Sequence, residues 1–257
     1  METRKSDDDR HPVILSVEGN IGAGKTTYLE MLKDAAKKRG GVYRENNGSH
    51  SPPLSQTSPN DRVVTPITFV PEPVETWKNV AGHNMLQLFY DNPKEHSLLF
   101  QATAAITRAR VLDECLRNVR GHSILERSIT SDGIFAANCH ASGLMSDLEY
   151  AVYMETWGYL MESNRYKVDG IIYLRESPET AFARKQVRGR TEEKSIVPQY
   201  LVDLHNLHEE TFGSASGHMA GTDIPVLVID AEQDFRPGSK FADVYAQKTW
   251  DFIEACM

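Results

Sequence analysis

The sequence predicts an α/β fold of three layers, in which a five-stranded parallel sheet carries helices on both faces. Two observations lead to this expectation. Short apolar runs alternate along the chain with longer segments of helical periodicity, which is the element order typical of a parallel sheet. In addition, the runs at residues 171–174 and 226–229 are apolar throughout, as strands covered on both faces are. We see no internal repeat and expect a single domain over residues 1–257.

Each expected element rests on the residues it contains. The expected strands are the short apolar runs, at residues 13–17, 67–70, 122–125, 170–174 and 225–229. The expected helices are the segments with helical spacing of apolar residues, at 27–39, 93–120, 131–140, 146–165 and 239–255, with short helices within 74–90 and further helices that begin at Pro178 and Pro198. Ser177 supports one of these starts, because serine caps helix N-termini and the proline that follows it suits the first turn.

Two segments lack such periodicity. Residues 1–12 are polar, and residues 40–66 are rich in Gly, Ser, Asn and Pro. We expect a flexible N-terminus and a loop insertion, the latter longer than most connections in a compact domain. A surface insertion without a role of its own is favoured for the loop, with a regulatory loop as the alternative.

Composition narrows the functions that are possible. A net charge of −8 argues against a broad nucleic-acid-binding surface, which would have to be basic. The three cysteines have no C-x-x-C spacing, so neither a disulfide framework nor a zinc site is expected and a reducing compartment is favoured. No apolar run approaches the ~20 residues of a membrane span, and the start lacks the features of a secretory signal or a transit peptide. We therefore expect a cytoplasmic protein without a membrane or nucleic-acid partner, and a mitochondrial or nuclear location stays open.

Residues 19–26 read G-N-I-G-A-G-K-T, the spacing of a phosphate-binding loop, between an expected strand and an expected helix. Glycines let backbone N–H groups approach an anion closely, and the helix start adds partial positive charge. Lys25 can reach the outer phosphates, and the Thr26 hydroxyl can hold the Mg²⁺ that bridges them. The four fixed positions should coincide by chance in roughly one chain in a hundred of this length, so we predict a nucleoside triphosphate site. Its residues are Gly19, Asn20, Ile21, Gly22, Ala23, Gly24, Lys25, Thr26 and Thr27.

Three charged side chains follow the next two expected strands. In open parallel sheets ligands bind at the carboxyl ends of the strands, so we expect Glu72, Glu126 and Arg127 to converge on the phosphate-binding loop. Glu72 lies between two prolines, and its carboxylate can accept the proton of an attacking hydroxyl; taken alone, it is equally well explained as a helix-start charge. Glu126 can replace the aspartate that holds Mg²⁺ in many phosphate-loop proteins. Arg127 can clamp an oxygen of the transferred phosphate.

A cluster of arginines near the end of a later helix predicts a lid. Arg184, Arg188 and Arg190 are followed by two glutamates. Residues 184–196 are expected to close over phosphates, stabilise their charge and exclude water. The alternative is a solvated helix end, where arginine is common.

The order of five motifs resembles the deoxynucleoside kinase family, which includes deoxycytidine, deoxyguanosine and mitochondrial thymidine kinases. The motifs are G-N-I-G-A-G-K-T-T, P-E-P-V-x-x-W, F-Q, E-R-S-x-x-S-D and R-G-R-x-E-E, and the resemblance covers residues 13 to about 212. The resemblance implies a P-loop kinase fold with an arginine-rich lid, ATP with Mg²⁺ as the phosphate donor, a deoxynucleoside as the acceptor and a role in nucleoside salvage. It also implies a homodimer formed through helices 93–120 and 146–165.

The resemblance further implies which residues carry the reaction. Glu72 is similar to the general base that takes the proton of the nucleoside 5′-hydroxyl, and Arg127 to the residue that contacts the same oxygen. With Lys25 they form the catalytic set. Tyr90 and Glu193 are similar to the pair that binds the sugar 3′-hydroxyl, and Tyr90 helps to exclude a ribose 2′-hydroxyl.

The base is expected to meet an amide and several apolar side chains. Gln101 is similar to the side chain that makes paired hydrogen bonds to the base, since an amide offers both a donor and an acceptor. The pocket walls implied by the resemblance are Trp77, Leu86, Phe100 and Phe135.

Two further positions bear on the choice of base. Arg108 follows Gln101 by seven residues, so both can face one pocket from the same helix. In the cytosine- and purine-preferring members of the family an Arg and an Asp occupy the places of Arg108 and Asp132, whereas the thymidine-preferring members have apolar residues there. The resemblance therefore implies deoxycytidine, deoxyadenosine or deoxyguanosine as the substrate, with a broad or thymidine-preferring enzyme as the alternative.

The chain departs from the family pattern at residues 131–135, which read S-D-G-I-F where members usually have S-D-R-Y-I-F. One residue is missing, and Gly133 replaces an Arg-Tyr pair. We expect this departure to shift the helix beside the base pocket, and with it Asp132 and Phe135.

Other classes of nucleotide-binding protein fit less well. A nucleoside monophosphate kinase would need cationic residues for the acceptor phosphate where Glu72 stands. A GTPase switch would need N-K-x-D and D-x-x-G motifs, and the sequence contains neither. A scaffold without activity is disfavoured, because candidates for a base, a clamp and a lid are all present.

Overall fold

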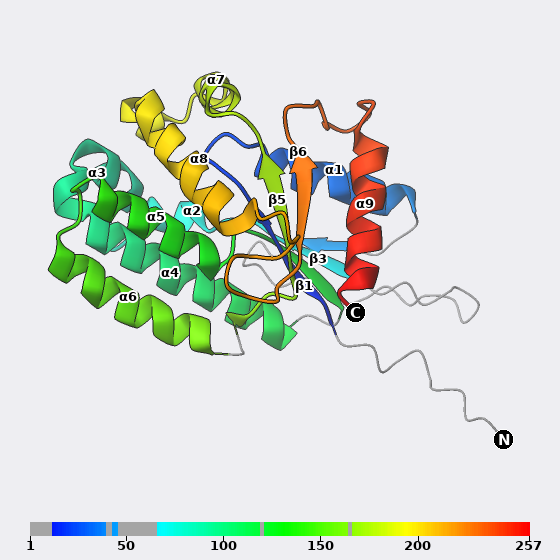
Figure 1. Cartoon of the computed structure of the whole chain (residues 1–257), viewed down its shortest axis with the longest axis horizontal. Helices are drawn as coiled ribbons and strands as arrows, with labels where there is room; N and C mark the ends of the chain where they lie inside the picture. The colour runs from blue at the N-terminus through cyan, green and yellow to red at the C-terminus, as the bar shows by residue number, and fades with distance from the viewer. Residues whose placement is uncertain (1–11, 40–42, 46–65, 119–120, 164–165) are drawn as a thin grey trace.

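The computed structural model describes residues 12–39, 43–45, 66–118, 121–163 and 166–257. These residues form three layers, with a sheet between two groups of helices (Figure 1). The expectations of a flexible N-terminus and of a loop insertion fall almost wholly outside the described residues.

The sheet is parallel throughout and has six strands in the order β2-β3-β4-β1-β5-β6. The strands are Ile14–Glu18 (β1), Tyr43–Glu45 (β2), Ile67–Val70 (β3), His122–Glu126 (β4), Gly170–Arg175 (β5) and Val226–Asp230 (β6). The five expected strands are thus confirmed, and with them the α/β fold class.

The short edge strand β2 corrects one expectation. Residues 43–45 pair with β3, so the prediction of a loop throughout residues 40–66 is wrong at these positions. Three residues are too few to show an apolar run or an alternation in the sequence. Strand β2 is defined by its pairing with β3 and has no local sequence pattern that would predict it.

Helices cover both faces of the sheet (Figure 1). The helices are Lys25–Lys38 (α1), Val74–Trp77 (α2), Met85–Asp91 (α3), Pro93–Asn118 (α4), Ile129–Ala141 (α5), Asp147–Glu162 (α6), Pro178–Arg188 (α7), Pro198–Phe212 (α8) and Ala242–Ala255 (α9), with a 3₁₀ turn at Thr191–Ser195 (η3). Helices α1 and α9 pack on one face of the sheet, and α4, α5 and α8 on the other. Helix α6 lies outside α4 and α5 (Figure 1). None of the described helices has the length and apolar character needed to cross a membrane.

The strands alternate their side chains between two apolar cores. In β5, Ile172 and Leu174 join the core beneath α1 and α9, whereas Ile171 and Tyr173 join the core beneath α8. This period of two is the geometry of a strand, and burial on both faces explains why the sequence of β5 is apolar throughout.

The register of the strands brings the chemistry to one edge of the sheet. Strand β1 lies between β4 and β5, with Val17 opposite Glu126, and Val70 of β3 lies opposite Leu125 of β4. The phosphate-binding loop, Glu72 and the residues after β4 therefore leave the sheet at the same edge, as expected for a parallel sheet.

Candidate active site

The phosphate-binding loop has the backbone that its glycine spacing predicts. Gly22 and Gly24 both have a φ of 91°, which residues with a side chain rarely adopt. A Cβ atom at Gly22 would stand 2.2 Å from the carbonyl oxygen of Ala181. Asn20 fixes the loop by donating from Nδ2 to the Leu201 carbonyl at 2.8 Å. Helix α1 begins directly after the loop and adds the partial positive charge of its N-terminus.

Lys25 is buried at this loop. Its ammonium group donates to the carbonyl oxygens of Gly19 at 3.2 Å and Asn20 at 2.7 Å. Burial, together with the charge of Arg127, lowers the pKa of Lys25 to about 7, although Glu72 and other carboxylates oppose this shift. A triphosphate in the loop would supply the negative charge that favours the ammonium form.

Glu72 follows β3 and lies between two arginines. Arg108 Nη2 donates to Glu72 Oε1, and Arg127 Nε lies 3.3 Å from the same oxygen. Burial raises the pKa of Glu72, but the charges of Arg108, Arg127 and Lys25 outweigh burial and lower it to about 2. Glu72 is therefore ionised at neutral pH, and it accepts hydrogen bonds but has no hydrogen to donate.

Arg127 has an unusual backbone conformation for a residue with a side chain. Its φ is 65°, in the left-handed region, and its N–H donates to the Val17 carbonyl at 3.1 Å. The guanidinium carbon lies 4.6 Å from the centroid of the Phe135 ring. The turn after β4 thus holds a cation between an aromatic face and the carboxylate of Glu72.

Thr26 and Glu126 form a pair of oxygen donors beside the loop. Thr26 Oγ1 donates to Glu126 Oε1 at 2.8 Å. Burial raises the pKa of Glu126, as does the nearby Glu72. Mg²⁺ prefers hard oxygen ligands and usually takes only one or two from the protein, the rest being water and phosphate oxygens. The two side chains fit that ion.

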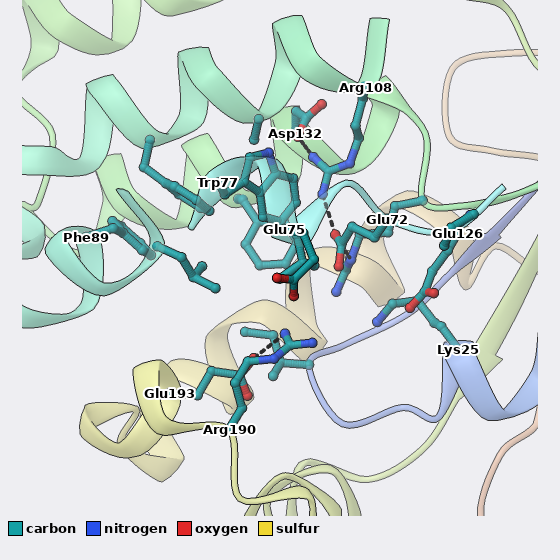
Figure 2. Close-up of a pocket in the computed structure, with 18 of the residues that line it drawn as sticks. Lys25, Glu72, Glu75, Trp77, Phe89, Arg108, Glu126, Asp132, Arg190 and Glu193 are labelled. Carbon is teal, nitrogen blue, oxygen red and sulfur yellow. Dashed lines mark hydrogen bonds and ion pairs between the residues drawn. The ribbon is translucent and has the colours of Figure 1, made fainter. Parts of the chain in front are cut away.

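A cavity of about 240 Å³, here called the first cavity, opens at this edge of the sheet. Figure 2 shows Lys25 and Glu126 at one end of it and Trp77 and Phe89 at the other. All eleven side chains expected at the nucleoside line it, namely Glu72, Trp77, Leu86, Tyr90, Phe100, Gln101, Arg108, Arg127, Asp132, Phe135 and Glu193.

Aromatic rings form the far end of the first cavity. Phe89 stacks on Phe100 with the ring centroids 4.8 Å apart, and Trp77 meets Phe100 edge-on at 5.4 Å. Trp77 is fixed further by a hydrogen bond from Nε1 to Thr107 Oγ1 at 2.8 Å. These packed rings suit a planar ligand.

Polar groups at the cavity wall are held by their neighbours. Gln101 is buried, and its Nε2 donates to Cys139 Sγ at 3.7 Å. Arg108 donates from Nη1 to Asp132 and from Nη2 to Glu72 (Figure 2). Among the described residues, Arg108 Nε and Asp132 Oδ2 are buried without a hydrogen-bond partner. One donor and one acceptor are thus left over in this pair.

The shortened motif at residues 131–135 is accommodated by a close contact between helices. Asp132 and Phe135 line the first cavity despite the missing residue. Gly133 lies against Trp157 of α6, and a Cβ atom there would stand 2.8 Å from two atoms of the indole ring. A bulky residue at position 133 would therefore displace α5 from α6.

A second cavity, of about 560 Å³, adjoins the first. The expected triphosphate and lid residues that line it are Gly22, Gly24, Lys25, Thr26, Thr27, Arg184 and Arg188. Lys25, Thr26, Glu126 and Arg188 line both cavities. The two cavities therefore meet beside the phosphate-binding loop. Gly19, Asn20 and Ala23 line neither cavity and shape the loop from within.

Several lining residues are not anticipated from the sequence. The loop at residues 232–236, which follows β6, lines the second cavity; its place at the carboxyl end of a strand is the only signal that points to it. The unanticipated residues of the first cavity are Pro71, Val74, Glu75, Phe89 and Ala104. Pro71 and Val74 belong to the P-E-P-V-x-x-W motif, from which only Glu72 and Trp77 were expected at the site. Glu75, Phe89 and Ala104 are fixed positions of no motif, and their helical positions are ordinary in the sequence.

The lid arginines contact protein groups in this structure. Arg184 Nη1 donates to the Ala231 carbonyl at 2.7 Å. Arg188 and Arg190 both pair with Glu193, the latter at 2.8 Å. Arg188 and Arg190 line the first cavity together with Glu193, so part of the segment expected to act as a lid borders this cavity.

The lid is also attached to α3. Asn84 Nδ2, at the start of α3, donates to Glu192 Oε1 at 3.3 Å, and Ser195 Oγ donates to the Tyr90 carbonyl at 3.0 Å. Both contacts hold η3 against the helix that carries Tyr90.

Comparison with known proteins agrees with this geometry. The model of the deoxynucleoside kinase family matches residues 62–254. The chain is 32% identical over 240 residues to a probable deoxycytidine kinase of fowlpox virus (strain NVSL), covering 93% of this chain and 87% of that protein. It is 31% identical over 263 residues to the mitochondrial deoxyguanosine kinase of Xenopus laevis, covering 93% and 89%. It is also 34% identical over 221 residues to the mitochondrial thymidine kinase 2 of Homo sapiens, covering 85% and 71%. The family model spans most of the chain, and the chain places a phosphate-binding loop beside a cavity lined by an ionised carboxylate. The chain therefore belongs to the deoxynucleoside kinase family and is an ATP-dependent deoxynucleoside kinase.

Proposed function

We propose that this kinase transfers the γ-phosphate of ATP to the 5′-hydroxyl of deoxycytidine, deoxyadenosine or deoxyguanosine in preference to thymidine, in nucleoside salvage. The observation that carries the base preference is the buried Arg108–Asp132 pair, which lines the first cavity together with Gln101. A charged pair offers donors and acceptors to the amino or carbonyl edge of a base. The same pair would crowd the methyl group of thymine and leave its own polar atoms unpaired.

Glu72 and Arg127 act on the attacking oxygen in this proposal. The carboxylate of Glu72, ionised because of its arginine neighbours, accepts the hydrogen bond of the 5′-hydroxyl and receives its proton as the bond to phosphorus forms. Arg127, 3.3 Å from Glu72, holds the same oxygen in line with the phosphate. Positioning of this kind supplies much of the rate in phosphoryl transfer.

The residues at the ATP end of the proposed site neutralise the negative charge of the phosphates. Lys25 and the loop N–H groups bind the phosphates, and Thr26 and Glu126 would hold Mg²⁺, which would offset the charge that develops during transfer. Arg188 lines both cavities and is placed to exchange Glu193 for the phosphates when ATP binds. Arg184 and Arg190 complete the lid.

The sugar is held at the mouth of the first cavity by Tyr90 and Glu193. Burial and the nearby carboxylates of Glu193 and Glu72 raise the pKa of Tyr90. The phenol therefore stays protonated and can donate to the 3′-hydroxyl, while its ring occupies the space that a 2′-hydroxyl would need.

The experiment that tests the reaction uses two acceptors with γ-labelled ATP and Mg²⁺. We expect label to pass to deoxycytidine, giving the 5′-monophosphate, and not to deoxycytidine monophosphate. Transfer to the monophosphate alone would show that the enzyme is a nucleoside monophosphate kinase.

We also propose a homodimer formed through α4 and α6. Exposed apolar side chains gather on these two helices: Leu99, Ile106, Leu148, Val152 and Tyr159. Tyr159 and Leu148 are 76% and 74% exposed, and an apolar cavity of about 650 Å³ lies between the helices. Apolar groups gathered in this way mark an interface more often than a free surface.

Light scattering during size exclusion tests the dimer. The double variant Leu99→Glu, Val152→Glu should run as a monomer, whereas Val244→Glu, which alters an exposed valine on α9, should not change the mass. A wild-type mass of one chain would contradict the dimer.

A further inference from the structure

Glu18 is a fully buried carboxylate that none of the roles above uses. It is the last residue of β1 and stands directly before the phosphate-binding loop, with no exposed surface. Its Oε1 accepts from Ser16 Oγ at 2.9 Å, from Ser128 N at 2.8 Å and from Ser128 Oγ at 2.7 Å, and its Oε2 accepts from Ser131 Oγ. A buried charge needs such partners. All four donors are uncharged, and three of them lie within four residues of Arg127.

These contacts hold the backbone around Arg127. Arg127 stands in the left-handed region, which a residue with a side chain keeps only where its surroundings determine it. Its own N–H is held by the Val17 carbonyl, and the next N–H, that of Ser128, is held by Glu18. Two consecutive residues at the end of β1 thus fix two consecutive amides at the end of β4.

Glu18 also acts on the side chain of Arg127. Ser131 gives its hydroxyl hydrogen to Glu18 Oε2, which leaves the lone pairs of Ser131 Oγ for Arg127 Nη1 at 3.5 Å. Without the carboxylate the hydroxyl could turn its hydrogen toward the guanidinium, and the contact would become repulsive. The series of hydrogen bonds from Arg127 through Ser131 to Glu18 therefore depends on the carboxylate of Glu18.

We infer that Glu18 is a positioning residue that holds Arg127 in its left-handed conformation and directs its guanidinium at the attacking oxygen. The inference rests on the proposed role of Arg127. Because Glu18 adjoins Gly19, the same carboxylate fixes the start of the phosphate-binding loop relative to the acceptor clamp. Glu18 thereby keeps the site of the phosphate donor and the site of the phosphate acceptor in a fixed position relative to each other.

A double-mutant cycle tests this inference. Glu18→Gln keeps the size of the side chain, but one of the two acceptor oxygens becomes an NH2 group, which cannot accept the hydrogen of a serine donor. We expect kcat for deoxycytidine to fall at least about tenfold, because small misplacements at the reacting atoms have large effects, while the Kd of a fluorescent ATP analogue and the melting temperature change little. In the Arg127→Ala background, Glu18→Gln should add less than about threefold, since residues that act as a unit are not additive. Equal losses in both backgrounds would overturn the inference, because Glu18 would then act on the fold and not through Arg127.

Ser131→Ala keeps the test decisive if Glu18→Gln fails to fold. This variant retains the carboxylate and removes only the relay to Arg127, so kcat should fall about threefold to tenfold, the usual value of one hydrogen bond, with an unchanged melting temperature. Full activity of Ser131→Ala would overturn the inference. Glu30→Gln, on the exposed side of α1 where Glu30 pairs with Lys33, serves as the control that leaves activity unchanged. Glu72→Ala distinguishes a failure of the proposed function from a failure of the positioning role. Full activity of Glu72→Ala would refute the proposed reaction site. Loss of activity in Glu72→Ala without loss in Glu18→Gln would refute only the positioning role of Glu18.

Discussion

At the scale of single residues, the charges around Glu72 connect the residues proposed to recognise the base with the carboxylate proposed to activate the sugar hydroxyl. Arg108 bonds to Asp132 with one nitrogen of its guanidinium and to Glu72 with another. Arg127 contacts Glu72 from the other side. In the proposed reaction, a base that displaces or strengthens the Arg108–Asp132 contact would therefore also change the charge balance at Glu72, the carboxylate proposed to orient the 5′-hydroxyl.

The first prediction concerns Glu72. Glu72→Ala removes the acceptor for the hydroxyl proton, and phosphorylation of deoxycytidine should fall by about 10² or more, the usual scale for a catalytic acid or base. Binding of ATP should persist, because the loop and Lys25 are unchanged. Turnover assays and titration with a fluorescent ATP analogue measure both, and a fully active variant would remove Glu72 from the mechanism.

The second prediction concerns the base. The double variant Arg108→Met, Asp132→Ala removes both members of the buried pair, whereas either single variant would leave one charge unpaired. We expect the ratio of kcat/KM for thymidine to that for deoxycytidine to rise, because room for the methyl group appears and polar partners for the cytosine edge are lost. An unchanged ratio would show that this pair does not read the base.

At the scale of elements, α5 and α8 support the first cavity from behind. Helix α5 carries Asp132 and Phe135 into the cavity and packs on Trp157 of α6 through Gly133. Helix α8 places His208 among Phe135, Tyr173 and Phe212. We therefore expect substitutions on the faces of these helices that point away from the cavity to lower the stability of the fold. Any change in the shape of the cavity should follow from that loss of stability.

Gly133 provides the third prediction. Gly133→Ala places a methyl group 2.8 Å from the Trp157 ring and should lower the free energy of unfolding by ~1–3 kcal/mol, the usual effect of overpacking. Gly158→Ala on α6 is the matched control, because a Cβ there meets nothing within 4 Å and alanine favours the helix by ~1 kcal/mol. Denaturant unfolding of the two variants should shift in opposite directions, and equal stability of both would contradict the close contact.

The fourth prediction concerns pH and His208. Burial, together with the charge of Arg127, lowers the pKa of His208 to about 3, although its hydrogen bond to the Leu204 carbonyl opposes this. An unfolded histidine titrates near 6.5, so between these two values the unfolded state binds more protons. The free energy of unfolding must therefore fall as the pH drops below about 6.5, by up to about 1.4 kcal/mol per pH unit.

His208→Phe keeps the contacts with Tyr173 and Phe212 and removes the titration. The loss of stability between pH 7 and pH 5 should be smaller in this variant by ~2 kcal/mol. Urea unfolding at the two pH values measures the difference. The same pH dependence in the variant and the wild type would contradict the buried neutral state.

At the scale of the whole molecule, local signals in the sequence predicted the fold and the phosphate-binding loop. The strands are continuous apolar runs, and the phosphate-binding loop is a fixed pattern, so both can be recognised without tertiary information. The eleven residues expected at the nucleoside could be named only through a registered family pattern, because Phe100 or Gln101 taken alone looks like any core or helix residue.

What could not be predicted depends on contacts between distant parts of the chain. Strand β2 exists through its pairing with β3. The hydrogen bond from Arg108 to Glu72 joins residues 36 positions apart. Glu18 accepts hydrogen bonds from Ser128 and Ser131, which lie more than a hundred residues away in the sequence. The loop at residues 232–236 reaches the second cavity only because β6 ends at the same edge of the sheet as β1.

The most direct test of the central claim is the relative kcat/KM for deoxycytidine, deoxyadenosine, deoxyguanosine, thymidine and adenosine, measured with ATP and Mg²⁺. We predict that at least one of the first three exceeds thymidine by about tenfold or more, since unpaired buried polar groups in a site discriminate on this scale or above. Adenosine should be used less well than deoxyadenosine, because in the proposed site Tyr90 would occupy the space of the 2′-hydroxyl. A preference for thymidine over all three would contradict the role assigned to the Arg108–Asp132 pair. If none of the five nucleosides were phosphorylated, the proposal that the acceptor nucleoside and the triphosphate bind next to each other beside Glu72 would be contradicted.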